Sequence, residues 1–360
     1  MKNFKFFILS TLTFFLVSCQ PDPANPLNQD YRNGVLVVNE GPFQTGTGTL
    51  SFAHFKRSAT DSTYAFLDVF QTVNGRVMGN IAQSAVRVGN HVLVAVNLAG
   101  TVEMLNAKTM ELEHTFTGLG LPRYFQALPN NRVALSDWQD NRIYVLDLTT
   151  KTVVDTVQVD AGPEGMAYLP NTPSGDVLLV ACSGGYSDNN TVVVLNAQMD
   201  RVKTLTVGDQ PHSFAQDPSG TWWLLNQGNP DWTTPANGTP GSLYRIDADA
   251  LTASLHTTSA DGSLHPAHLL CDGTGLVFIS DRYTGSAVRM PLGSTVWPTV
   301  PFLSGASYSV AFDALKKEFY SGKIVDYSGP GTLVRYNEQG VALDSVSTGQ
   351  IPGFILPESH

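Results

Sequence analysis

Short apolar runs separated by polar turns recur along most of the chain. Residues 121–165 read LPRYFQALPNNRVALSDWQDNRIYVLDLTTKTVVDTVQVDAGPEG, in which four such runs stand between turns rich in Pro, Asn, Asp and Gly. Apolar and polar residues alternate from Arg142 to Asp147, which is typical of a strand in packed sheets. The stretch therefore predicts four short β-strands.

This four-strand pattern repeats with a period of about 40–45 residues, which is typical of β-propellers. Six complete units run from about residue 80 to 351, and a seventh is split between the chain ends. The C-terminal PGFILP supplies its innermost strand, while NGVLVVNEGPF, GTLSFAHF and AFLDVF supply the other three. Such closure leaves no open sheet edge. The sequence thus predicts an all-β fold, a single seven-bladed β-propeller over residues 34–360. The units begin at Ala82, Pro122, Pro163, Pro211, Pro266, Ala306 and Pro352.

The N-terminus is typical of an exported protein. Lys2 and Lys5 precede an apolar run, Phe6 to Val17, that is shorter than the roughly 20 residues of a membrane span. We therefore expect a signal peptide over residues 1–18. The segment from Leu16 to Cys19 resembles the bacterial lipobox, which implies lipidation of Cys19. The alternative is an ordinary secretory signal with a chance cysteine.

Residues 19–33 are polar and Pro-rich, which predicts a flexible tether. We expect the propeller to be lipid-anchored to the outer membrane of the cell envelope, facing the exterior.

Composition narrows the range of partners. The chain has 21 Lys and Arg against 31 Asp and Glu, a net charge of −10. Nucleic acid and anionic membrane surfaces are therefore not expected as partners, because binding phosphates requires a basic surface. Apart from Cys19, the cysteines are Cys182 and Cys271, which fall in non-adjacent units. We expect both to be buried free thiols, and a disulfide between them is the alternative.

The strand order predicts one polar face. In a four-stranded antiparallel blade, the start of the innermost strand and the loop after the second strand lie on the same side. The predicted positions at strand starts are Gln83, Arg123, Glu164, His212, Ala267, Ser307 and Tyr308. The positions after second strands are Asn39, Glu40, Asn97, Asp137, Trp138, Ser183, Tyr186, Asn226, Gln227, Asp281, Arg282, Tyr283, Gly322 and Lys323.

Long loops fall on the same predicted face, at residues 39–48, 183–190, 226–241 and 321–331. A turn that only reverses a strand needs about two to five residues, so these loops favour a binding rim. Asn, Gln and Arg side chains there suit amides or a phosphate of a ligand. The alternative is that these polar groups serve neighbouring loops and pair between blades. The aromatic side chains expected to contact a large flat ligand are Phe43, Trp138, Tyr186, Trp232, Tyr283 and Tyr327.

Signals for catalysis are weak. The sequence contains no GxSxG, HExxH or CxxC motif. His265 and His268 stand three residues apart at a strand start rather than on a helix, so we expect no metal site, no cofactor and no catalytic residue. An enzymatic alternative, a propeller lactonase or lyase, would use Glu40, Glu164, His212 and Asp281 as acid, base or metal ligands.

Three phrases carry a family resemblance. NRIYVLDLTT and NTVVVLNAQM resemble the third strands of YVTN-type propeller repeats. The opening GVLVVNEGPFQTGTGTLSFAHF resembles the first blade of bacterial surface propeller lipoproteins that capture cobalamin beside a TonB-dependent transporter. The resemblance covers most of residues 33–357. It implies a non-enzymatic protein that binds a nutrient, cobalamin or another corrinoid, and passes it to an outer-membrane transporter. An adhesion or scaffold propeller that binds protein or glycan is a further alternative.

Overall fold

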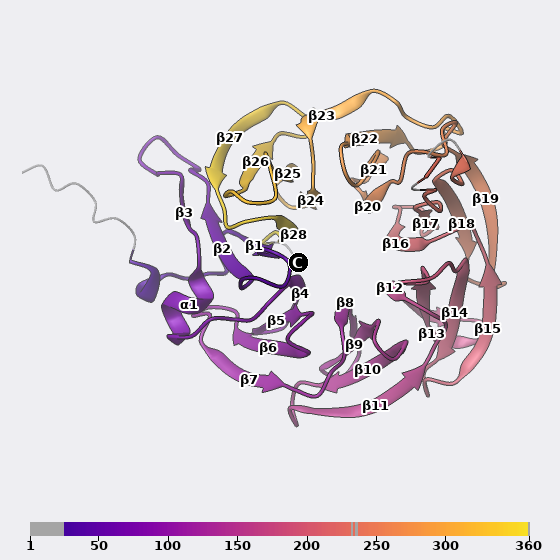
Figure 1. The fold of residues 1–360 in the computed structure, drawn as a ribbon, viewed down its shortest axis with the longest axis horizontal. Helices are drawn as coiled ribbons and strands as arrows, with labels where there is room; N and C mark the ends of the chain where they lie inside the picture. The colour runs from indigo at the N-terminus through magenta and orange to yellow at the C-terminus, as the bar shows by residue number, and fades with distance from the viewer. Residues whose placement is uncertain (1–24, 232, 235–236, 359–360) are drawn as a thin grey trace, which may run out of the picture.

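The chain forms a ring of seven four-stranded antiparallel sheets (Figure 1). The region about the central axis, between the innermost strands, is called the channel below. The computed structural model describes residues 25–231, 233–234 and 237–358. The helices with described bounds are the 3-10 turn η1 (Pro26–Asn28) and the short α1 (Val69–Asn74). None of the helices in the described ranges is long and apolar enough to cross a membrane. The predicted all-β propeller of seven blades is confirmed.

The strands of each blade follow one another from the channel outward. Blade 2 holds β4 (Ala82–Val88), β5 (His91–Val96), β6 (Thr101–Asn106) and β7 (Leu112–Phe116), and blade 3 holds β8 (Pro122–Leu128), β9 (Arg132–Asp137), β10 (Arg142–Asp147) and β11 (Thr152–Gln158). Blade 4 holds β12 (Pro163–Thr172), β13 (Gly175–Cys182), β14 (Thr191–Asn196) and β15 (Arg201–Thr206). Blade 5 holds β16 (Pro211–Gln216), β17 (Trp222–Asn226), β18 (Ser242–Asp247) and β19 (Thr252–Thr258). Blade 6 holds β20 (Ala267–Cys271), β21 (Gly275–Ile279), β22 (Ser286–Pro291) and β23 (Pro301–Ala306), and blade 7 holds β24 (Ser309–Asp313), β25 (Glu318–Lys323), β26 (Thr332–Tyr336) and β27 (Ala342–Ser347).

Blade 1 is built from both ends of the chain, as predicted. Its order is β28 (Pro352–Leu356), β1 (Val35–Asn39), β2 (Thr49–His54) and β3 (Tyr64–Phe66). The C-terminal β28 pairs antiparallel with β1, with Leu36 opposite Leu356. Because main-chain hydrogen bonds join the two ends, the ring has no open edge between its first and last blades.

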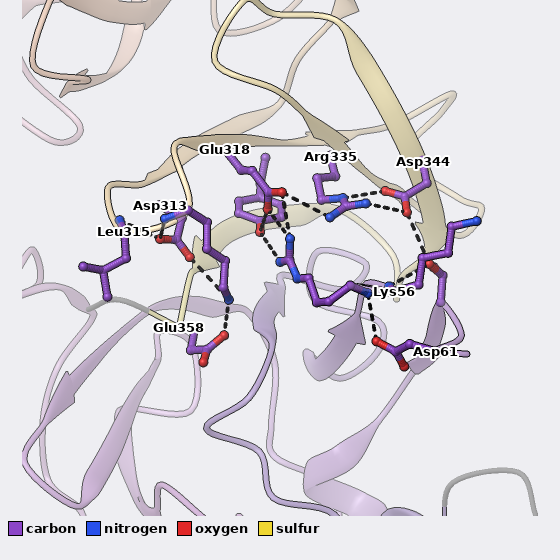
Figure 2. A network of polar contacts seen from close by, with 12 residues as sticks. Lys56, Asp61, Asp313, Leu315, Glu318, Arg335, Asp344 and Glu358 are labelled. Atoms are coloured by element: carbon purple, nitrogen blue, oxygen red, sulfur yellow. Dashed lines mark hydrogen bonds and ion pairs between the residues drawn. The ribbon is translucent and has the colours of Figure 1, made fainter. Parts of the chain in front are cut away.

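Polar side chains reinforce the seam between blades 7 and 1 (Figure 2). Arg57, in the loop after β2, donates to Glu318 at 2.7 Å. Arg335 on β26 contacts the same carboxylate at 3.1 Å and also pairs with Asp344 on β27 at 2.8 Å. Lys316 pairs with Glu358 just beyond β28. These contacts join segments that are far apart in the sequence.

An Asn or Asp at the end of the third strand fixes the turn to the fourth in five blades. Asp147 illustrates this, since its Oδ1 accepts hydrogen bonds from the backbone N–H groups of Thr149 and Thr150, both at 2.9 Å. A side-chain oxygen that caps such a turn explains why these residue types recur there. The equivalent residues are Asn106, Asn196, Asp247 and Asn337.

The hydrophobic core lies between blades rather than in one central mass. Buried hydrophobic side chains of the described residues form seven clusters, one at each junction of neighbouring blades. Trp223 of blade 5 and Phe278 of blade 6, for example, share one cluster. Each large apolar side chain buried in this way contributes about 1.5–3 kcal/mol. The core thus holds the blades to each other and leaves the channel to other side chains.

The segment before β1 packs against the propeller. Tyr31 is fully buried, donates its hydroxyl to the carbonyl of Pro26 at 2.7 Å, and meets Phe52 edge-to-face at 5.0 Å. Its backbone N–H also bonds to the carbonyl of Lys108 in blade 2 at 2.9 Å. Residues 25–33 therefore belong to the packed domain, which corrects the expectation of a flexible tether through residue 33. Cys19 and the predicted signal peptide lie outside the described residues.

Cys182 and Cys271 are both free thiols, as expected. Cys182 is buried in blade 4, and burial raises the pKa of its thiol to about 12. Cys271 lies at the end of β20 in blade 6 and is only partly buried. The fold is therefore held by packing and hydrogen bonds, not by a disulfide between these two residues.

Candidate functional site

The upper face is defined here as the side on which innermost strands begin and second strands end. Near the start of most innermost strands the pairing register with the second strand shifts by a β-bulge. A bulge turns a side chain away from the regular alternation of the strand. The residues that occupy these bulges are Gln83, Arg123, Tyr124, Glu164, Gly165, His212, His268, Leu269 and Gly353.

Arg123 links three blades within this ring of bulged residues. Its Nη1 donates to Oε1 of Gln83 in blade 2 at 2.6 Å, and its Nη2 contacts Glu164 in blade 4 at 3.2 Å. Glu164 is almost fully buried, and burial raises the pKa of its carboxyl while Arg123 opposes the shift. The charged groups of Arg123 and Glu164 are therefore engaged with each other, and this ion pair joins blades 3 and 4.

In blade 1 the carboxylate at the channel comes from the residue after the second strand, not from the bulge of the innermost strand. Its bulge residue is Gly353, and a Cβ there would lie 2.4 Å from Oε1 of Glu40. The side chain of Glu40, which follows β1, therefore takes the space beside the glycine. The hydroxyl of Tyr308 donates to both oxygens of Glu40 at 3.2 Å. Burial raises the pKa of Glu40 to about 7, against the opposing effects of Tyr308 and Arg123.

Two histidines lie further along the channel. The rings of His212 and His268 are 6.1 Å apart, and Tyr124 meets His212 at 5.8 Å. His268, not Ala267, occupies the bulge of blade 6, because β20 begins at Ala267 rather than at Pro266. A shift of one residue reverses which side chains face the channel. The predicted channel position in blade 6 is corrected accordingly.

A pocket of about 470 Å³ opens on the upper face over blades 3 to 6. Its aromatic wall is Trp138, which stacks 4.0 Å from the Arg123 guanidinium and meets Tyr186 edge-to-face at 5.5 Å. Opposite, Arg282 donates to Oε1 of Gln227 at 2.9 Å. The pocket unites six of the residues predicted for this face with the long loops after β13 and β17. These six are Trp138, Glu164, Ser183, Tyr186, Gln227 and Arg282.

Other predicted aromatics stand exposed, outside this pocket. Phe43, Tyr283 and Tyr327 are about half exposed or more. Tyr327 meets Tyr308 edge-to-face at 6.3 Å, and Arg282 lies over the ring of Tyr283 at 4.8 Å. Trp232, predicted for the same rim, lies outside the described residues.

Several predicted rim residues use their polar groups within the fold. Asn39 donates to Ser51 at 2.9 Å, and Asn97 donates to the carbonyl of Pro122 at 3.0 Å in the next blade. Lys323 turns outward and donates to the carbonyl of Ser304 at 2.6 Å. The carboxylates of Asp137 and Asp281 cap the turns that follow their own strands. The polar groups of these five residues hold loops and strands in place. This agrees with the alternative stated above, in which such groups serve neighbouring loops.

Sequence reasoning missed other residues that line the pocket and channel. Tyr124, Gly165 and Phe354 line the channel, and Gln210 and Asn229 line the upper pocket. The signal that could have found Tyr124 and Gly165 is their position two residues after a proline that starts a blade. Gln210 and Asn229 stand in loops whose path the repeat does not specify.

The upper face offers hydrogen-bonding and aromatic groups. Nowhere in the described parts of the chain do three or more His, Cys, Asp or Glu side chains group so that they could hold a metal ion. Two buried N–H groups of the upper pocket, Nε1 of Trp138 and Nε of Arg282, have no hydrogen-bond partner among the described residues. Buried donors without partners are uncommon in proteins, so a ligand acceptor would satisfy them.

Fold and site together define a seven-bladed propeller with a recessed polar and aromatic pocket on one face. Residues 33–268 match the domain of unknown function DUF5074, and the chain belongs to this family. No curated protein matches the sequence.

Solved structures with the same fold are distant in sequence. A quinonprotein alcohol dehydrogenase-like protein from Bacteroides thetaiotaomicron is 13% identical with a TM-score of 0.67, covering 92% of this chain and 79% of its own. A protein from Lactobacillus plantarum is 13% identical with a TM-score of 0.64, covering 90% and 99%. The hydrazine synthase of Kuenenia stuttgartiensis is 16% identical with a TM-score of 0.53, covering 76% and 88%. At these identities the likeness concerns the fold alone.

Proposed function

We propose that this protein captures a small nutrient ligand on its upper face and does not transform it. The observation that carries the proposal is the upper pocket, where Trp138 and Tyr186 face Gln227 and Arg282. The unpaired N–H groups of Trp138 and Arg282 call for acceptor oxygens on the ligand. The nearby carboxylate of Glu164 is engaged by Arg123, which favours binding over acid–base chemistry.

The ligand we propose is cobalamin or another corrinoid. A corrin ring offers a broad flat surface, and its fringe of amides offers both donors and acceptors. The exposed rings of Phe43, Tyr283 and Tyr327 suit the parts of such a ligand that extend beyond a pocket of about 470 Å³. The first-blade resemblance supports the same choice.

We further propose that a lipid on Cys19 holds the protein at the outer membrane beside a TonB-dependent transporter. The support is the lipobox-like sequence together with the topology of blade 1. Since β1 runs toward the upper face, the chain enters the propeller at the opposite face. An anchor at that end leaves the upper face open for ligand exchange with a transporter. Loss of metabolic lipid labelling in Cys19→Ala is the expected result, and unchanged labelling contradicts the anchor.

Calorimetric titration of the purified protein with cyanocobalamin tests the ligand. We expect saturable binding that Tyr186→Ala and Trp138→Ala each weaken by about tenfold or more, as truncation of a central aromatic contact does. Leu315→Ala is the matched control for Tyr186→Ala, because both side chains are 85% exposed and Leu315 lies on the opposite face. Absence of binding at micromolar ligand rules out cobalamin as the cargo. An equal loss of affinity in Tyr186→Ala, Trp138→Ala and Leu315→Ala rules out the proposed pocket as the binding site.

The enzymatic alternative has one observation in its favour. Glu40 has a pKa near 7, which suits a general acid or base at neutral pH. Hydrolysis of lactone substrates that is lost in Glu40→Gln would support an enzyme instead. Under the binding proposal, we expect no turnover by the wild-type protein.

A further inference from the structure

A second cavity lies within the central channel, formed by innermost strands. It measures about 170 Å³ and is separate in its lining from the upper pocket. Its polar groups come from Tyr124, His212, Ser213, His268 and Ser309. The remaining walls are apolar, including Leu269, Val310, Phe354 and Ile355. The cavity is smaller than the roughly 300–1,000 Å³ of typical organic ligand sites.

The two histidines in this cavity have no hydrogen-bond partner among the described residues. His212 is only 8% exposed, and its Nδ1 is fully buried without a partner. Two other histidines do use a ring nitrogen, since His265 bonds to the carbonyl of Gln227 at 3.1 Å and His256 to that of Ser294 at 2.7 Å. Buried polar atoms are normally satisfied, so the unpaired Nδ1 of His212, beside the partly buried ring of His268, points to a missing ligand.

The two side chains that face each other in this cavity are both imidazoles. Neutral imidazole is a common ligand of zinc, copper and nickel. Two imidazoles on one ion place their ring centres roughly 5–6.5 Å apart, given metal–nitrogen bonds of about 2.0–2.1 Å. The observed separation of 6.1 Å falls within this range.

The backbone and nearby charges are compatible with a cation here. His268 has a φ of +58°, a conformation uncommon for a residue with a side chain, at the bulge that brings it to the channel. Arg123 and Arg282 act on His212 with positive charge. Glu164 and Glu40 both act on Arg123 with opposite charge, which offsets part of this positive charge.

We propose that His212 and His268 together bind one divalent late first-row transition metal ion in the channel, with solvent completing its coordination. This inference does not depend on the proposed nutrient capture. It also differs from a site at His265 and His268, because His265 is bonded to Gln227 and does not line the cavity.

Titration of the full, untagged chain with Cu²⁺ and Zn²⁺ tests the proposal. We expect one ion per protein after desalting, and an affinity about tenfold or more weaker in both His212→Gln and His268→Gln. His114→Gln, on the outer strand β7, controls for surface chelation and retains wild-type binding. Absence of wild-type binding, or unchanged affinity in both channel variants, overturns the site.

A spectroscopic measurement keeps the test decisive if a variant does not fold. The electron paramagnetic resonance spectrum of the wild-type protein with one Cu²⁺ should show coupling to two imidazole nitrogens. Coupling to fewer than two overturns the proposal. Cyanocobalamin binding is measured separately on the metal-free protein, so either function can fail while the other stands.

Discussion

Arg57 and Glu318 form an ion pair at 2.7 Å across the seam between blades 1 and 7, although 261 residues separate them in the chain. Glu318 also receives Arg335, so one largely buried carboxylate serves two guanidinium groups. Removing the Glu318 carboxylate takes one ionic partner from each of Arg57 and Arg335, although Arg335 keeps its pair with Asp344. The charge pair thus supplements the main-chain pairing of β28 with β1 in closing the ring.

We therefore expect Glu318→Gln to lower the free energy of unfolding by about 2–4 kcal/mol, near the range for breaking a buried ion pair. Urea unfolding followed by circular dichroism measures the loss. Asp30→Asn, which removes the more exposed pair with Arg32, should cost no more than about 0.5–1 kcal/mol. Equal losses in the two variants would show that the seam pair has no special role in closure.

The Arg123–Glu164 pair makes a prediction about coupling. Arg123→Met should cost about 3–5 kcal/mol, because it leaves a buried carboxylate without its cation. Glu164→Gln added to Arg123→Met removes that charge, so the double variant should be more stable than Arg123→Met alone. Urea unfolding of the four proteins gives the coupling energy, and strictly additive costs contradict a direct pair.

Gly165 allows blades 4 and 5 to approach closely beside the channel. A Cβ at this position would lie 2.5 Å from the carbonyl oxygen of His212, which is backbone and cannot rotate away. Gly165→Ala should therefore destabilise the fold by about 1–3 kcal/mol, as overpacking does. In Gly329→Ala the nearest contact is an ordinary 3.5 Å, so thermal unfolding should be within error of wild type. A neutral Gly165→Ala would refute the close approach.

Glu40 makes stability depend on pH near neutrality. Burial raises its pKa from an ordinary 4.5 to about 7, so the folded protein holds this proton more tightly than the unfolded chain. The resulting stabilisation is complete below about pH 4.5 and is lost as the pH rises through about 7. Glu40→Gln cannot ionise and keeps an oxygen to accept the Tyr308 hydroxyl.

Relative to wild type, Glu40→Gln should therefore gain about 1–3 kcal/mol in unfolding free energy between about pH 5 and about pH 8. Denaturant unfolding of both proteins at the two pH values measures this gain. Glu338→Gln, an exposed substitution in the turn after β26, should show no such change. Parallel pH profiles for wild type and Glu40→Gln would mean that the carboxylate is not buried in solution.

Much of the architecture could be predicted because each blade repeats the same local pattern. The innermost strands of blades 2 to 5 begin at the predicted Ala82, Pro122, Pro163 and Pro211. Blade 7 begins at Ser309, three residues after the predicted Ala306, which instead ends β23. Blade 6 begins one residue later than predicted, because Pro266 resembles the proline that starts other blades. That single residue decided whether Ala267 or His268 faces the channel.

The candidate site was less predictable than the fold. Gln83, Arg123, Glu164, His212 and Tyr308 were named from strand order, and the structure brings them together around the channel. Strand order also selected Asn97 and Lys323, but the polar groups of these two side chains donate hydrogen bonds to backbone carbonyls of neighbouring blades. Position on a strand gives the face on which a residue lies, whereas its partners depend on the neighbouring blade.

By itself, the sequence determined the number of blades, most of their strands and the split closure, since these follow from hydrophobic spacing and turn residues. It did not predict that the outer strand of blade 1 ends at Phe66 and that α1 begins at Val69. Only the tertiary structure decided that Arg123 pairs with Glu164, that Glu40 fills the space beside Gly353, and that His212 faces His268. The physical reason is that each of these contacts joins separate blades. Their geometry is set by how the whole ring packs and closes, which no local pattern records.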